Sequence, residues 1–137
     1  MGGRLNFSGS FFYLDTLRSS NNGVTVDPQA GEIGTPKYSG QMNVSYAAPS
    51  GTGISIQANY TGKAKYDMLF NADSRDILEL EDQWLFNLAL SQKIADKATL
   101  RFNVSNLFDT APPYPYDLLS SYDLLGRRYT VSMNVKF

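Results

Sequence analysis

The chain has 137 residues and a mass of 15.2 kDa, enough for one domain. Its 12 basic and 13 acidic side chains nearly balance, so no global electric field attracts it to nucleic acid, and we expect no nucleic-acid partner. It contains no cysteine and no histidine, which excludes disulfides, zinc–thiolate sites, histidine-based catalysis and imidazole metal sites. We expect no enzyme activity, no catalytic or metal-binding residues and no cofactor.

Six segments alternate apolar and polar residues with a period of two, which is typical of β-strands. They lie near residues 4–14, 37–47, 54–66, 83–94, 99–108 and 128–137. A tilted strand that crosses a membrane needs about 9–11 residues, whereas strands in globular proteins usually have about five or six. The sequence therefore predicts an all-β fold, an antiparallel meander of about six long strands in a single unit spanning residues 1–137.

The connections between these strands alternate in length. Long loops are expected at 15–36, 67–82 and 109–126, and short turns near 49–53 and 95–98. A meander with this alternation has every long loop on one edge and every tight turn on the other, as outer-membrane barrels do.

The two faces of the predicted sheet differ in composition. One face carries mainly Ser, Asn, Gln and Thr, which suits a wet barrel lumen, and the other carries most of the aromatic residues. Aromatic rings are favoured at headgroup depth in a membrane. We expect an aromatic girdle near the long-loop edge, made of Tyr13, Tyr38, Tyr66, Trp84, Phe108 and Tyr129.

A second interpretation stays open. Alternation also occurs in half-buried strands, so the chain could be a small soluble β-barrel or sandwich that buries its aromatic face and binds an apolar ligand. Under the membrane interpretation, six strands are too few, because single-chain barrels start at about eight. We then expect a part of a larger barrel, or a chain that self-associates by pairing its strand edges with other copies.

The last forty residues resemble the C-terminal end of a TonB-dependent outer-membrane receptor. The similarity lies in a strand that ends in Asn106-Leu107-Phe108-Asp109, a tyrosine-rich loop, Gly126-Arg127, and a final alternating strand that closes on an aromatic residue. It is specific over residues 99–137 and generic over 4–95. It implies the C-terminal part of a transmembrane β-barrel of about 22 strands.

The resemblance also implies a function and partners. The family resides in the outer membrane of Gram-negative bacteria and imports scarce bulky solutes such as siderophores, vitamins or oligosaccharides. Implied partners are outer-membrane lipid, the N-terminal barrel and plug of the same receptor, the TonB energy-coupling protein acting on that plug, and the barrel-assembly machinery. Because import needs the plug, we expect this segment alone not to transport. The final strand resembles the assembly signal, carried by Tyr129, Met133, Val135 and Phe137.

Two loops carry candidate ligand contacts. Residues 73–82 hold five carboxylates, but their spacing lacks the glycine of a calcium loop, so a solvated loop is the simpler interpretation. Tyr114, Tyr116 and Tyr122 lie in the loop 109–126 and could stack on a flat ligand or on sugars, or simply pack the loop.

Overall fold

The computed structural model describes residues 2–67, 71–73, 77–94, 97–113 and 125–136. Within these ranges the chain is all-β, with one six-stranded antiparallel sheet and two small two-stranded sheets. The large sheet contains β1 (Arg4–Tyr13), β4 (Tyr38–Ala47), β5 (Thr52–Thr61), β8 (Gln83–Ile94), β9 (Ala98–Ser105) and β10 (Arg128–Val135). Each strand pairs with the next in this order, so the predicted all-β fold with a six-stranded antiparallel meander is confirmed. No helix in the described ranges is long and apolar enough to cross a membrane.

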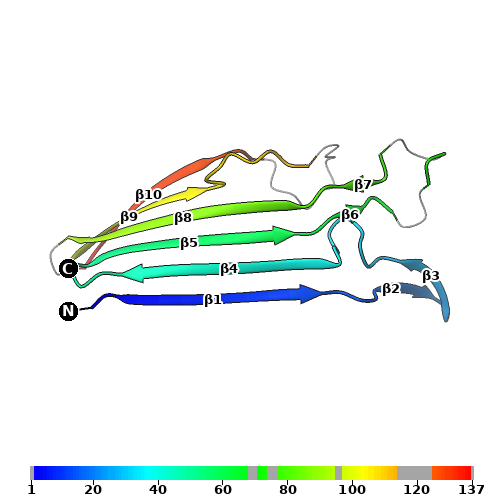
Figure 1. The fold of residues 1–137 in the computed structure, drawn as a ribbon, viewed down its shortest axis with the longest axis horizontal. Helices are drawn as coiled ribbons and strands as arrows, with labels where there is room; N and C mark the ends of the chain where they lie inside the picture. The colour runs from blue at the N-terminus through cyan, green and yellow to red at the C-terminus, as the bar shows by residue number, and fades with distance from the viewer. Residues whose placement is uncertain (1, 68–70, 74–76, 95–96, 114–124, 137) are drawn as a thin grey trace.

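The six strands form a single layer (Figure 1). The β4–β5 turn lies at one end of the strands, and the small β2–β3 and β6–β7 hairpins extend beyond the opposite end, which we call the long-loop edge. The β4–β5 turn closes with hydrogen bonds from the Gly51 N–H to the Ala48 carbonyl (3.1 Å) and from the Ala48 N–H to the Thr52 carbonyl (2.8 Å). Gly51 has a φ of 84°, a left-handed conformation that glycine adopts without steric cost.

The register keeps each face continuous across the whole sheet. Phe7 lies opposite Val44, which lies opposite Ile56, which lies opposite Leu88. On the other face Asn43 lies between Ser8 and Gln57, which in turn pairs with Asn87. A shift of one residue in any strand would reverse its faces, so the alternating pattern excludes such a shift.

The loops contain structure that the alternation did not predict. The expected loop 15–36 holds a hairpin of β2 (Arg18–Asn21) and β3 (Val24–Pro28). Its two-residue turn is Asn22-Gly23, with φ values of 52° and 79°, the pair that such a turn requires. The expected strand 54–66 ends at Thr61 and resumes as β6 (Ala64–Lys65), which pairs with β7 (Glu79–Leu80) inside the expected loop 67–82.

The expected strand 99–108 is also shorter, because β9 ends at Ser105. Asn106 has a φ of 52° and Asp109 a φ of 56°, and a run of extended residues cannot continue through such positions. Leu107 still donates its N–H to the Phe86 carbonyl (2.7 Å), so the chain stays beside β8 while it turns. The Asn-Leu-Phe-Asp segment is therefore a turn that follows the strand.

The most buried apolar side chains lie mainly in the loops. Leu80 is fully buried, and Ala64 and Ala30 are nearly so. The segment after β3 is hydrogen-bonded to β6, with the Lys65 N–H donated to the Gly31 carbonyl (2.7 Å) and the Ile33 N–H to the Lys65 carbonyl (2.9 Å). We call residues 29–35 together with β6 and β7 the loop cluster. It forms a packed unit at the long-loop edge.

Candidate functional site

The apolar face of the large sheet is uncovered in the described structure. It carries one large apolar side chain after another at high exposure, among them Phe7 (70%) at one end of the sheet and Val131 (66%) at the other. Soluble monomers rarely expose a continuous apolar surface of more than a few hundred Å². A surface of this extent therefore requires a lipid or protein environment.

The opposite face is polar but carries few charges. Neutral side chains bond to one another across strands: the Ser55 hydroxyl donates to the Asn43 amide oxygen (2.7 Å) and the Asn87 amide reaches the Gln57 amide oxygen (3.5 Å). Phe12 and Leu85 are its large apolar exceptions, because their strand positions place them on this face. The alternation of residues 54–66 would also place Lys63 and Lys65 here, but both lie beyond the end of β5.

The aromatic residues form rows of ring contacts near the long-loop edge. Tyr13 stacks on Tyr38 with 5.1 Å between ring centroids, and Tyr60 lies 4.8 Å from Trp84. The second row continues from Trp84 to Phe86 (6.1 Å) and to Phe108 (5.2 Å). Tyr129 stacks on Phe102 at 6.1 Å. Five of the six predicted girdle residues thus lie on or directly beside the sheet: Tyr13, Tyr38, Trp84, Phe108 and Tyr129.

Tyr66 is the exception among the girdle residues. It follows β6, outside the large sheet, and its N–H bonds the Leu78 carbonyl across the β6–β7 hairpin (3.1 Å). Tyr60, which pairs directly with Trp84 in the register, takes the position in the row that the sequence assigned to Tyr66.

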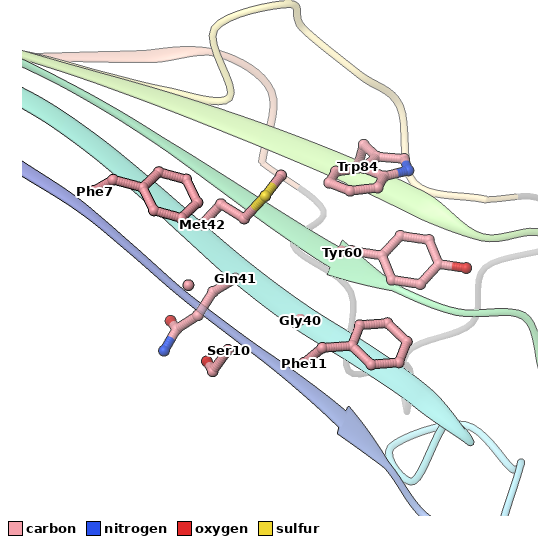
Figure 2. Close-up of a pocket in the computed structure, with 9 residues that line it drawn as sticks. Phe7, Ser10, Phe11, Gly40, Gln41, Met42, Tyr60 and Trp84 are labelled. Atoms are coloured by element: carbon pink, nitrogen blue, oxygen red, sulfur yellow. The ribbon is translucent and has the colours of Figure 1, made fainter.

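A hollow of about 400 Å³ interrupts the apolar face beside β1 (Figure 2). Gly9 and Gly40 have no side chains to fill it, while Phe7, Phe11, Met42, Tyr60 and Trp84 surround it. Figure 2 shows these five side chains projecting to one side of the sheet, with Ser10 and Gln41 on the other.

The residues of the family-like motif come together in one turn, although a long loop separates Asp109 from Gly126 in the sequence. The buried Asn106 amide donates to the Thr110 carbonyl (2.9 Å) and accepts from the Thr110 N–H (2.8 Å). The Asp109 carboxylate accepts the Arg127 N–H (2.8 Å), and the Arg127 guanidinium donates to the Leu107 carbonyl (3.3 Å). We call this arrangement of 106–110 and 126–127 the clasp. It joins the end of β9 to the start of β10.

Gly126 and Phe108 complete the clasp. A Cβ at Gly126 would lie 2.9 Å from the Asp109 carboxylate, so a larger residue would displace that hydrogen bond. The Phe108 ring points to the apolar face, where it meets Phe86 edge-on. Arg127 also lies over the Tyr129 ring at 5.9 Å. The motif residues therefore connect the turn, the aromatic row and the last strand.

Two ion pairs lie in and beside the loop cluster. Lys63 forms an ion pair with Glu81 (2.9 Å), and Lys65 lies 3.8 Å from Glu79. The hydrogen bond and charge of Glu81 raise the pKa of Lys63 above its ordinary value. Among the residues that the structure describes, no three carboxylates gather into a group that could hold a metal ion.

Several predicted site residues lie outside the described part of the chain. These are Tyr114, Tyr116 and Tyr122 of the candidate ligand loop, and Phe137 of the candidate assembly signal. The other assembly-signal residues, Tyr129, Met133 and Val135, lie on β10 and share the apolar face. All three side chains are exposed.

No protein-family model, curated protein or solved structure matches this chain. The family that the last forty residues resemble therefore stays a prediction.

Proposed function

We propose that this chain is a segment of an outer-membrane β-barrel, the C-terminal part of a TonB-dependent receptor. Its apolar face contacts lipid and its polar face lines the lumen. The intact receptor would import a scarce bulky solute such as a siderophore, a vitamin or an oligosaccharide, with energy from the TonB coupling protein.

One observation carries this proposal: the apolar face is continuous across six long strands, and nothing in the described structure covers it. A lipid environment would cover such a face without a second protein layer. The aromatic rows at the long-loop edge support the orientation, because rings with polar tips are favoured where hydrocarbon meets headgroups. The neutral polar face supports a lumen, and the clasp brings together the residues of the receptor-like motif.

The single tryptophan provides a direct test. Trp84 lies on the apolar face and is 42% exposed. When the 137-residue chain is folded into vesicles, lipids brominated on their acyl chains should quench Trp84 fluorescence, and bromines close to the headgroup should quench it most. The matched control is a Trp84→Phe, Leu85→Trp double variant, because position 85 is on the polar face. Its tryptophan should be quenched far less.

A second candidate function is a small soluble β-protein that binds an apolar ligand. The hollow between Gly9 and Gly40 favours it, since apolar and aromatic side chains surround it. The same samples distinguish the two functions. A sharp 15.2 kDa species in detergent-free buffer, with no quenching of Trp84 by brominated lipid, would overturn the receptor proposal and support the soluble protein.

A further inference from the structure

The two outermost strands of the large sheet, β1 and β10, each have one side without a strand partner in the described structure, and their unpaired backbone groups belong to the same face. In an antiparallel pair, residues that exchange hydrogen bonds alternate with residues that do not. The Leu14 N–H bonds the Lys37 carbonyl (2.9 Å) and continues the β1–β4 ladder at even positions of β1. The even residues of β1 are its polar-face residues. The N–H and C=O groups of its apolar-face residues, such as Phe7, Gly9 and Phe11, therefore point away from β4 to the outer edge.

The β10 edge shows the same arrangement. The Lys136 N–H bonds the Lys97 carbonyl (2.8 Å), which continues the β10–β9 ladder at the polar-face residues. The backbone groups of Tyr129, Val131, Met133 and Val135 point outward. Neighbouring strands run in opposite directions, and β1 and β10 are the first and sixth strands of the sheet, so they also run in opposite directions. If β10 of one sheet lies beside β1 of another, the apolar-face residues of the two strands can exchange backbone hydrogen bonds as an antiparallel pair. The apolar face of one sheet then continues into the apolar face of the other.

We propose that β10 of one copy pairs with β1 of a second copy, with Tyr129 opposite Tyr13 and Met133 opposite Gly9. This pairing would hydrogen-bond the exposed backbone groups of both edges, which are costly in lipid and promote aggregation in water. The pairing concerns the 137-residue chain on its own, and it does not depend on the identity of the imported solute. In the intact receptor proposed above, other strands of the same barrel would pair with these two edges instead.

The hollow beside Gly9 favours this register. Met133 has an exposed, flexible side chain on the apolar face of β10. In the proposed pairing it lies at Gly9, where the hollow is lined by Phe7, Phe11 and Met42. The neighbouring Val131 and Val135 then lie beside Phe11 and Phe7, so apolar side chains continue on both sides of the hollow.

The polar face favours the same register. The Ser10 hydroxyl is buried and has no hydrogen-bond partner within the described structure. The pairing places Ser132 opposite Ser10, in a non-hydrogen-bonded position where the side chains of an antiparallel pair come closest. A hydroxyl at that position is both donor and acceptor, so it can satisfy the buried Ser10 oxygen.

Charges disfavour two of the competing pairings. A slip of two residues in one direction would place Lys136 opposite Arg4, and pairing β10 with its own copy would bring Arg128 opposite Lys136. Like charges directly opposite each other destabilise a sheet. In the proposed register Lys136 lies opposite Asn6, and Asp15 lies beside the arginines that begin β10.

Disulfide trapping tests the pairing, because the chain has no cysteine of its own. Two single variants of the full chain, Ser10→Cys and Ser132→Cys, carry different size tags and are mixed in mild detergent under oxidising conditions. Directly opposed residues lie within the separation that a disulfide spans. We expect a 10–132 heterodimer as the main product. Two control variants replace Ser132→Cys in the mixture with Ser10→Cys. They are Val131→Cys, which lies on the other face, and Thr130→Cys, which is displaced by two residues. Each should give at least fivefold less heterodimer.

A backbone variant checks that the edge itself is responsible. Phe11→Pro removes an outward N–H that the second copy would bond, and proline is tolerated on edge strands where the N–H faces outward. We expect this variant, placed in the Ser10→Cys chain, to lose the heterodimer while circular dichroism still shows its β-structure.

Three results would overturn the pairing: equal yields with the control cysteines, a dominant 10–10 homodimer, or a Phe11→Pro chain that still forms the heterodimer. Bromolipid quenching of Trp84 in the same samples reports on the proposed function separately. Strong quenching without the heterodimer would overturn the pairing alone.

Discussion

At the scale of single residues, Asn106 shows how one side chain can end a strand. Its left-handed φ stops β9, and its amide then replaces the lost strand partners by bonding both backbone groups of Thr110. Asparagine is suited to both tasks, because it tolerates positive φ more readily than most residues and its amide both donates and accepts. The Asn87 side chain in turn accepts the Asn106 N–H (3.0 Å), which ties the clasp to β8.

We expect Asn106→Ala to destabilise the folded chain by about 1–3 kcal/mol, since it leaves buried backbone groups of Thr110 without partners. Urea denaturation in detergent, followed by Trp84 fluorescence, measures this loss. Asn103→Ala is the control, because Asn103 lies on the polar face of β9 at an extended backbone position. Equal effects of the two variants would contradict the role assigned to the clasp.

At the scale of elements, the loop cluster has a stability of its own. Leu80 is its most buried side chain, lies opposite Ala64 in the β6–β7 pair, and is not part of the large sheet. The ion pairs of Lys63 and Lys65 nearby are exposed and contribute little. Burial of Leu80 is therefore expected to contribute more to the stability of this region than the ion pairs do.

Leu80→Ala should lower the free energy of local opening of the loop cluster by about 2–5 kcal/mol, the usual cost of truncating a buried leucine. Amide hydrogen exchange at Ile33 and Lys65, whose N–H groups join the two parts of the cluster, should accelerate accordingly. Exchange in β5 should not change. Ile77→Ala, at a half-exposed position of the same connection, should alter neither, and a uniform acceleration across the sheet would contradict an independent unit.

The ion pair between Lys63 and Glu81 has a definite pH dependence. Glu81 raises the pKa of Lys63, so the pair stabilises the fold below the ordinary lysine pKa and loses its contribution as pH rises through the raised value. A carbon NMR titration of the Lys63 side chain should show the raised pKa. Glu81→Gln should lower the pKa of Lys63 toward its ordinary value, although the charges of Asp82 and Glu79 remain. High salt should also lower it in part. An unchanged pKa in Glu81→Gln would disprove the pair.

The elements also show what the sequence could predict. The six long strands were predictable because each alternates over about ten residues, which also assigns the residues to the two faces. Alternation alone excludes only slips by an odd number of residues, so the exact register came from the structure. The β2–β3 hairpin carried a readable signal, the Asn22-Gly23 turn, but its strands are too short to alternate clearly. The contact between Gly31 and Lys65 had no signal, because it joins two backbones and depends on no side-chain type.

The candidate site was predictable to a different degree. The motif residues were identified by similarity, but nothing in the sequence revealed that Asp109 bonds the Arg127 backbone, 18 positions further along the chain. Parity placed Tyr13, Tyr38, Trp84 and Tyr129 on the apolar face of long strands, where the structure has them, while their role as a membrane girdle stays a prediction. Parity also placed Tyr66 on this face because the alternation continues past Gly62, where the strand breaks. Periodicity predicts faces well and strand ends poorly.

At the scale of the whole molecule, the two faces require different solvents. The apolar face of the large sheet has no second layer in the described structure, while the polar face holds a network of neutral side chains. In a two-layer soluble protein the apolar face would lie against another sheet or helix and the polar face would carry mixed charges. This asymmetry is the physical basis of the membrane proposal, and it can be tested one residue at a time.

Ile56 and Gln57 are the matched pair for that test, because they are neighbours at the centre of β5 and face opposite sides of the sheet. If the apolar face contacts lipid, Ile56→Arg should cost about 2–4 kcal/mol near the bilayer midplane, whereas Gln57→Arg keeps its charge in the aqueous lumen and should cost much less. Denaturant-induced unfolding from vesicles gives both values. A soluble protein that buries Ile56 would also be destabilised by Ile56→Arg, so this cost alone does not distinguish lipid from protein. The cost is therefore measured in bilayers of different thickness as well. Thinner bilayers should reduce the cost at Ile56 because they bring water closer to the midplane. A cost at Ile56 that is independent of thickness would mean that protein, and not lipid, covers this face.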